Sequence, residues 1–444
     1  MHFKTLGALI WIGTVSAFPV RAGQDDAKPA KKWTQSELET ISREIQRDLE
    51  RLRGEEFSSP VAVKVSSKAD LIEYMKVRSA KTDPPAKLAA DEQVAKMLGV
   101  VDPGLDVQAK LQQLLESQVA GFYDPDTKSF SLMETLPVGL TKITLAHELD
   151  HALDDQLFDL DGHIAALGND TDTQFAFQAV VEGSGTAVMT EWMMSSGNVS
   201  ELLGSVSDQQ RAELSSMAGA PPWLWKPLLG CYITGGAFLL RTDNWLAAQQ
   251  SLAMKQGSLA SADVRAAFAK PPRSTEQVLH PEKYWDPKKL DEPRAVAIDT
   301  SKIERGWQVL REDTLGEFLV AMICTPPSQR DVDISNEAAV MGLTFTNQVA
   351  VGWGGDRLVL LGNGDARVLR WVTAWDSARD AGEFYGAMTQ LMPSFEAAAR
   401  ALSGDKPSDS GATVEYGAAE DEVVLTVRSR VSRGDLKRLL KSLQ

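Results

Sequence analysis

The chain has 444 residues and a formal net charge of −15, which results from 46 basic and 61 acidic side chains. This excess of acid disfavours nucleic acids and anionic membrane surfaces as partners, because both repel a negatively charged protein. A chain of this length is sufficient for two domains of ordinary size.

Residues 1–22 have the three parts of a secretory signal peptide. A basic residue precedes the apolar run from Leu6 to Phe18, and small residues precede Gly23. The run is shorter than the roughly 20 residues that a membrane-spanning helix needs. We therefore expect cleavage after Ala22, a secreted or periplasmic protein, and no stable membrane insertion. An uncleaved membrane anchor is the alternative.

The residues that follow predict a short leader and then regular structure. Residues 23–32 are polar and charged, which predicts a disordered leader. A helix is expected from Thr34 to Arg53, because Thr34 and Glu37 form a capping-box pattern at its start. The valine-rich residues 61–65 predict a strand, followed by another helix.

A predicted hairpin comes directly before the most informative helix of the chain. Residues 106–117 predict a helix, and residues 119–123 and 129–133 predict two strands. The turn Asp124-Pro125-Asp126-Thr127 joins these strands. The next apolar helical pattern covers residues 143–153.

Residues 143–153 contain the motif His147-Glu148-Leu149-Asp150-His151. Its two histidines are two of only five in the chain. Residues four apart on an α-helix lie on one face, about 6 Å apart, so both imidazoles can bind one metal ion. Glu148 would then lie beside the open coordination position, where it can act as a general base on water. The alternative is an ordinary buried helix whose histidines hydrogen-bond to neighbouring residues.

Hydrolytic zinc sites usually take three protein ligands, so a third donor is required. Glu182 is the candidate, because it is a lone carboxylate in the apolar stretch 175–189, and residues 143–210 contain no Lys or Arg. Burial of an unpaired carboxylate is costly, and a metal ion removes that cost. Gly183 and Gly185 beside it predict a close approach of another helix.

These residues resemble the zincin metallopeptidases, and in particular the gluzincin type, whose third zinc ligand is a glutamate on a following helix. The resemblance is carried by His147, Glu148, His151 and Glu182. It implies one Zn²⁺ per chain, held by the two histidines and Glu182, with Glu148 as the general base. An orienting aspartate is often found at the position of Thr186, and the candidates to replace it are Asp150, Asp154 and Asp155.

Further segments resemble an exported, largely uncharacterised prokaryotic family of such proteins. They are Gly121-Phe122-Tyr123-Asp124-Pro125, Glu182-Gly183-Ser184-Gly185-Thr186, the segment from Ser274 to Tyr284, and Gly352-Trp353-Gly354-Gly355-Asp356-Arg357. The zincin resemblance implies that Gly121, Phe122 and Tyr123 bind an extended substrate by strand addition. A plain sheet edge is the alternative.

A peptide hydrolase also needs a donor that stabilises the oxyanion of the tetrahedral intermediate. His280 is the first candidate, followed by Tyr284 and Tyr123. For His280 the alternative is a structural histidine in a loop.

Helices are also expected from Glu182 through Trp192, at 207–217 and at 228–249. Three tryptophans in this region are expected in the core: Trp223, Trp225 and Trp245. Cys231 and Cys324 permit one disulfide in an oxidising compartment, but each lies in an apolar segment where a free thiol also packs well. Both interpretations stay open.

The residues after 298 predict a small α+β domain with helices on one face of an antiparallel sheet. Asp356 and Arg357 form a candidate functional pair in it. The expected helices are 315–324, 377–391 and 433–443, the expected strands are 348–351, 357–361, 367–374, 414–416 and 423–428, and residues 403–411 are expected to form a loop.

The sequence therefore predicts an α+β protein, with a mainly helical zincin-like catalytic domain at 33–298 that has a small sheet, and a small α+β domain at 299–444. The expected activity is that of a secreted zinc-dependent metallopeptidase, with a peptide or protein as substrate. Two alternatives remain: a zinc-binding cell-envelope interaction protein without hydrolytic activity, and an amidase that acts on cell-wall peptides.

Overall fold

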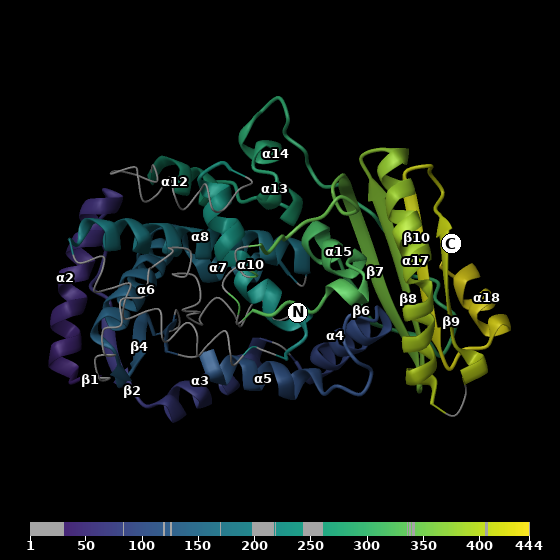
Figure 1. Cartoon of the computed structure of the whole chain (residues 1–444), viewed down its shortest axis with the longest axis horizontal. Coiled ribbons are helices and arrows are strands. Elements are labelled where there is room, and N and C mark those ends of the chain that lie inside the picture. The colour runs from purple at the N-terminus through teal and green to yellow at the C-terminus, as the bar shows by residue number, and fades with distance from the viewer. Residues whose placement is uncertain are drawn as a thin grey trace.

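The computed structural model describes residues 31–443 except 83, 119, 125–126, 169, 198–216, 218, 243–260, 335, 337–338, 340–341 and 405–406. A largely helical part occupies one end of the molecule and a five-stranded sheet the other (Figure 1). The predicted α+β class is confirmed. The expected signal peptide lies outside the described residues.

The N-terminal part contains a three-stranded sheet in the order β2-β4-β3. Strand β2 (Ala62–Ser66) runs parallel to β4 (Ser129–Met133), and β4 runs antiparallel to β3 (Gly121–Asp124). The predicted hairpin of β3 and β4 is therefore confirmed, although the middle of its turn lies outside the described residues. This hairpin leads into the helix that carries the His-Glu-x-x-His motif.

The end of the expected leader is part of a strand pair. Strand β1 (Lys31–Lys32) pairs with β5 (Thr135–Leu136), and Trp33 is buried with its indole nitrogen donating to the Leu136 carbonyl at 3.2 Å. The disorder predicted for residues 31 and 32 was wrong, because the apolar Trp33 anchors this segment.

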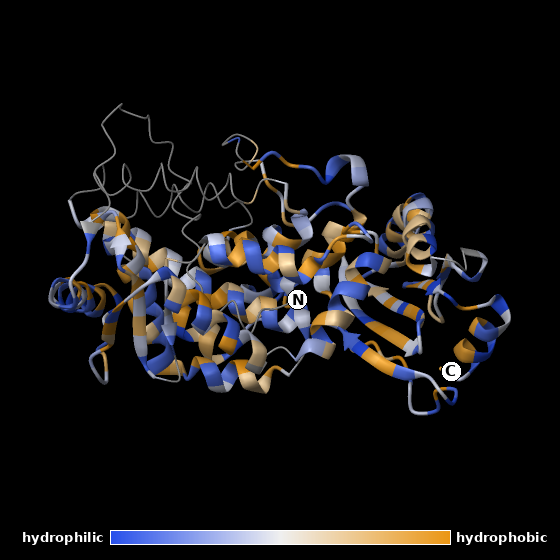
Figure 2. Cartoon of the chain, turned by 90° about the horizontal axis from the view of Figure 1, so that it is seen from below, coloured by the Kyte–Doolittle hydropathy of each residue, from blue (hydrophilic) through white to orange (hydrophobic). Residues whose placement is uncertain are grey.

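The helices of the N-terminal part surround this small sheet and continue beyond it. Figure 2 shows that hydrophobic residues gather on the central helices, whereas α2 at the edge is largely hydrophilic. The elements are α2 (Gln35–Arg53), α3 (Lys68–Thr82), α4 (Pro85–Met97), α5 (Val107–Gln118), α6 (Val138–Phe158), α7 (Leu160–Ala166), α8 (Thr171–Ser195), α10 (Pro222–Leu239), α12 (Ser261–Ala269), α13 (Thr275–Leu279) and α14 (Glu282–Trp285).

Capping residues determine where some of these helices begin. The predicted capping box of α2 is confirmed, because Thr34 and Glu37 each accept a hydrogen bond from the other residue's backbone N–H. Helix α4 was not expected, since its residues carry no pronounced apolar stripe.

Helix α10 begins six residues before the predicted start, with Pro222 at its first position, where a missing N–H costs nothing. It ends at Leu239, and Arg241 follows in a left-handed backbone conformation. Trp223 and Trp225 are buried as expected. Trp245, residues 243–249 of this predicted helix and residues 207–216 of the preceding one lie outside the described residues.

The C-terminal part is built on a five-stranded antiparallel sheet in the order β6-β7-β8-β10-β9. Its elements are β6 (Gln308–Asp313), α15 (Gly316–Cys324), β7 (Trp353–Asn363), β8 (Ala366–Trp375), α17 (Ala378–Ser403), β9 (Gly411–Tyr416), β10 (Glu422–Ser429) and α18 (Arg433–Lys441).

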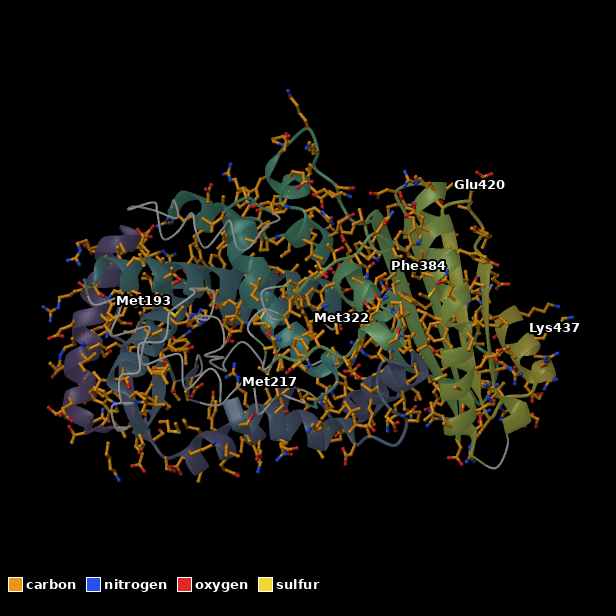
Figure 3. All side chains as sticks on the ribbon, in the orientation of Figure 1. Met193, Met217, Met322, Phe384, Glu420 and Lys437 are labelled. Atoms are coloured by element: carbon orange, nitrogen blue, oxygen red, sulfur yellow. The ribbon has the colours of Figure 1, made fainter. Side chains whose placement is uncertain are left out.

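Helices cover both faces of this sheet, so the expectation of helices on one face was wrong. Leu360 of β7 shares a buried cluster with Phe384 of α17, whereas its neighbour Val359 shares another with Leu439 of α18. Successive strand residues point to opposite faces, and a strand covered on both sides is apolar on both. Figure 3 shows Phe384 at the α17 layer and Lys437 pointing outward from α18.

The prediction of a strand at residues 348–351 was also wrong. The side-chain oxygen of Asn347 accepts the backbone N–H groups of Val349 and Ala350 at 3.1 Å, which folds this segment into a turn. A side chain that bonds its own backbone two residues on favours turns over strands.

The two parts share one continuous hydrophobic core across the predicted boundary at residue 298. A single cluster of buried side chains includes residues of α4, α8, α10, α15, β7 and α17. Met322 of α15 belongs to it and lies in the middle of the molecule, where the helical part meets the sheet (Figure 3). The C-terminal sheet therefore shares its core with α8, which carries Glu182, and α15 lies between the two.

Asp356 has a structural position, and the expected functional pair with Arg357 is not formed. Arg357 lies on the opposite face of β7 and donates to the Val296 carbonyl at 3.4 Å. Burial raises the pKa of Asp356 to about 6, although its carboxylate accepts four hydrogen bonds. The donors are the indole nitrogens of Trp353 and Trp371, at 2.9 and 3.1 Å, and the backbone N–H groups of Leu315 and Gly316, at 3.0 and 2.9 Å.

Replacement of Asp356 by alanine should destabilise the protein strongly. It leaves four buried donors without an acceptor, and each such donor costs about 1–3 kcal/mol, so we expect a loss of at least about 3 kcal/mol in the free energy of unfolding. Urea denaturation measures this loss. Asp365→Ala is the control, since that side chain is 87% exposed, and equal midpoints for the two variants would contradict the structural role.

Among the described helices, none is both long enough and apolar enough to cross a lipid bilayer.

Candidate metal centre

Helices α6 and α8 bring three possible ligands to one point. His147 and His151 come from α6, and Glu182 comes from α8. The Nε2 atoms of the two histidines are 2.9 Å apart, and Glu182 Oε2 lies 3.2 Å from His147 Nε2 and 3.4 Å from His151 Nε2. The three side chains that the sequence analysis proposed as ligands are therefore neighbours.

These distances fit a single metal ion of zinc size. Zinc–nitrogen bonds of about 2.0–2.1 Å in a tetrahedral arrangement place ligand atoms about 3.3 Å from one another. The three separations lie close to that value. Two imidazoles and one carboxylate are also the donor set of many hydrolytic zinc sites. The residues present therefore fit Zn²⁺.

Glycines on α8 allow this close packing, as their presence beside Glu182 predicted. A Cβ atom at Gly185 would lie 2.8 Å from the Cε1 atoms of both His147 and His151. A Cβ at Gly183 would lie 2.4 Å from the backbone of Gly235 on α10. Only glycine lets α8 approach the imidazoles on one side and α10 on the other.

The electrostatics of the cluster require a positive charge beside Glu182. Burial raises the pKa of Glu182, but the two histidines outweigh burial and hold it at about 2. Burial lowers the pKa of His147. Burial also acts to lower the pKa of His151, but the Glu182 carboxylate overcomes this and raises it to about 9. The buried carboxylate is thus stabilised by a proton on His151 or by a bound cation.

Two contacts around the three candidate ligands were missed by the sequence analysis. Gln178, one turn before Glu182, donates to Glu182 Oε1 at 2.7 Å. The ring of Tyr232 on α10 stacks on His147 with 5.8 Å between ring centroids. Gln178 was within reach of prediction, since residues four apart on a helix are neighbours. Tyr232 was not, because only the packing of α10 brings it to the site.

Glu148 lies beside these three side chains and is almost fully buried, with 2% of its surface exposed. Its Oε2 accepts the backbone N–H of Tyr123 at 3.0 Å. Burial raises the pKa of Glu148 to about 8. Strand β3, which carries Gly121, Phe122 and Tyr123, is the strand of its sheet nearest to α6 and lies at the edge in the order β2-β4-β3.

The candidate orienting acids make other contacts. Asp150 and Asp154 both accept hydrogen bonds from the guanidinium of Arg53 on α2. The distance from Arg53 Nη2 to Asp154 Oδ1 is 2.7 Å. Asp155 accepts the Tyr123 hydroxyl at 3.0 Å and the Lys128 ammonium at 2.5 Å. Within the described residues none of the three hydrogen-bonds to a motif histidine, so their orienting role stays a prediction. Asp150 and Asp154 instead tie α6 to α2.

His280 and Tyr284 lie in a different cluster. Thr275 begins the short helix that leads to His280, and its backbone N–H donates to Asp172. Asp172 lies ten residues before Glu182 on α8, which is about 15 Å along the helix. His280 Nε2 is 2.9 Å from Glu317 Oε1 on α15. The Tyr284 hydroxyl donates to the Lys270 carbonyl at 2.6 Å. These positions do not fit the expected oxyanion role.

The two cysteines are buried free thiols, so the disulfide interpretation was wrong. Cys231 lies next to Tyr232 on α10, and its thiol donates to the Leu228 carbonyl at 3.2 Å. Burial raises the pKa of both thiols.

A second group of carboxylates, Glu276, Asp291 and Asp376, surrounds the ammonium group of Lys283 at 2.6, 2.9 and 2.9 Å. The lysine already supplies the positive charge there. This group is therefore an ion-pair network between the two parts of the chain.

Comparisons with known proteins concern the C-terminal part only. Residues 302–438 match the family model described as a domain of unknown function (DUF8575). This range lies within the predicted C-terminal domain and covers less than half of the chain. Comparison with curated proteins and with solved structures gives no match.

Replacement of Gly185 by alanine should weaken zinc binding. The new Cβ must displace both imidazoles, and displacement of ligand side chains typically lowers metal affinity about 10- to 100-fold. Competition with a fluorescent zinc chelator measures this affinity. Gly236→Ala is the control, because a Cβ there meets nothing within 4 Å, and equal zinc affinities in the two variants would contradict the packing argument.

Replacement of Arg53 by methionine should destabilise the fold around α6. The side chains of Asp150 and Asp154 are fully buried, and removal of one partner of a buried ion pair costs about 3–5 kcal/mol. The midpoint of urea denaturation should fall accordingly. Arg51→Met, at a side chain that is 73% exposed, should change it little. A comparable shift in both variants would show that the buried contact is unimportant.

Proposed function

We propose that the chain is a zinc-dependent metallopeptidase that hydrolyses peptide bonds. The observation that carries this proposal is the convergence of His147, His151 and Glu182 within 3.4 Å of one another beside Glu148. The two histidines and Glu182 would hold the zinc. A bound zinc ion supplies Lewis-acid chemistry, because it polarises a carbonyl group and acidifies water.

In this proposal Glu148 is the general base. It follows the first ligand directly on α6, so its carboxylate is at the site where water attacks the scissile carbonyl. A cation held by the neighbouring side chains would lower the pKa of Glu148 again and keep it ionised. Glu148 then takes a proton from that water and delivers it to the leaving amine. A side chain in such a role contributes roughly 100- to 10,000-fold to the rate.

Strand β3 is proposed to bind the substrate backbone. An edge strand can pair with an extended peptide, and the backbone N–H of Tyr123 reaches Glu148 from this strand. A peptide that pairs with β3 therefore passes next to the general base. The hydroxyl of Tyr123 bonds to Asp155, so the side chain helps to hold the strand on α6.

The burial of the site favours a second candidate, a zinc-binding protein without hydrolytic activity. His147, Glu148, His151 and Glu182 are each no more than 4% exposed. Access of a substrate therefore requires movement of the elements around them. A zinc site that serves only for structure has no need of access. Export through residues 1–22 stays a prediction in both cases.

Metal content and peptide hydrolysis of the wild type and Glu148→Gln distinguish these functions. We expect about one zinc per chain in both proteins, cleavage of a peptide library by the wild type, and a loss of 100-fold or more in the variant. Glu420→Gln, at an exposed side chain that Figure 3 labels, is the matched control and should cleave normally.

Other results would argue against the peptidase. Zinc without cleavage by the wild type would favour the non-hydrolytic zinc protein. Absence of zinc from the purified protein, together with failure to bind it on addition, would contradict both functions.

A further inference from the structure

A pocket lies between the N-terminal end of α10 and the segment that follows α15. The pocket offers about 50 Å³ to the centres of water-sized molecules and opens to solvent, and none of its lining residues belongs to the metal centre. Trp223, Trp225, Met322 and Val332 make much of its wall apolar. Met322 marks its place in the middle of the molecule (Figure 3).

Lys226 lines this pocket without a carboxylate partner among the described residues. Its ammonium group lies over the ring of Phe345, 5.7 Å from the ring centroid. Burial lowers the pKa of Lys226 to about 8. An ammonium group in such surroundings is stabilised by an anion that enters the pocket.

Arg330 supplies a second positive charge in the pocket wall. Its guanidinium donates to the backbone carbonyls of Thr325, Ile323 and Gly99 at 2.8, 3.0 and 2.5 Å, and it forms no ion pair among the described residues. A guanidinium has five N–H donors, so three such bonds leave donors for a ligand. Its backbone contacts hold the charge in place at the end of α15.

The first turn of α10 adds to this positive character. Helix α10 has 18 residues, and its first residue, Pro222, lines the pocket. The N-terminal end of a helix carries partial positive charge. Two cationic side chains and a helix N-terminus therefore converge on an apolar pocket, in a protein whose net charge is −15.

We propose that this pocket binds a small amphipathic anion, a carboxylate or phosphate joined to an aliphatic or aromatic group. The anionic group lies beside Lys226 and Arg330, and the apolar group packs against the two tryptophans and Met322. The chemistry of the wall excludes organic cations, because they would face two positive charges.

Calorimetric titration of the full chain with octanoate, octyl phosphate and 1-octanol tests this proposal. We expect an octyl anion to bind at least tenfold more tightly than octanol, because a hydrogen bond to a charged group contributes about this factor or more. The tighter of the two anions identifies the group that the pocket selects. Equal binding of octanol and both anions would overturn the proposal, as would no binding of either anion.

Lys226→Met keeps most of the side-chain length and removes the charge. It should lower the affinity for the octyl anion at least tenfold and leave octanol binding unchanged. The matched control is Lys288→Met, at an exposed lysine outside the pocket, which should bind as the wild type does. An unchanged affinity of Lys226→Met for the anion would overturn the proposal.

Acetylation of the wild type gives a readout that needs no variant. At pH 7 the amine of Lys226 should react faster with acetic anhydride than an equally buried lysine with an ordinary pKa of about 10.4. The reason is that its pKa of about 8 leaves more of the amine uncharged. Saturation with the octyl anion should raise that pKa and slow labelling of Lys226 about tenfold, without effect at Lys288. Peptide mass mapping measures both sites, and equal labelling of Lys226 with and without the anion would overturn the proposal.

Discussion

The structure of the N-terminal part depends on the burial of the Glu182 carboxylate against two imidazoles. Such a carboxylate is stable in the interior only with a positive charge at contact distance. The two histidines provide that environment from α6, and Gly185 gives them room against α8. Arg53 compensates two further buried acids on α6, so the helix that carries the motif is held from both α8 and α2.

Much of this centre could be predicted from the sequence because its information is local. The spacing of His147 and His151 gives a shared helix face, and the absence of basic residues around Glu182 indicates an unusual partner. The contacts that could not be predicted join distant segments. Arg53 meets Asp150 across 97 positions, and His280 meets Glu317 across 37, and neither pairing leaves a periodic pattern in the sequence.

In the C-terminal part, elements with strong patterns were predicted and those with mixed residues were not. The apolar run from Leu358 to Leu361 correctly predicted a strand. A run that is apolar at every position also indicates a sheet covered on both faces, and this was not predicted. Strand β6 is rich in charged residues and was missed. Asp356 shows why a distinctive motif is not always a functional site, since its carboxylate organises two indoles and the start of α15.

Crystals of the zinc-loaded protein, measured at the zinc absorption edge, test the central claim most directly. We predict one anomalous peak bounded by the Nε2 atoms of His147 and His151 and by Glu182, with metal–nitrogen distances of about 2.0–2.1 Å. A peak at another group of side chains, or density that shows the two imidazoles bonded to each other in the presence of zinc, would contradict the account.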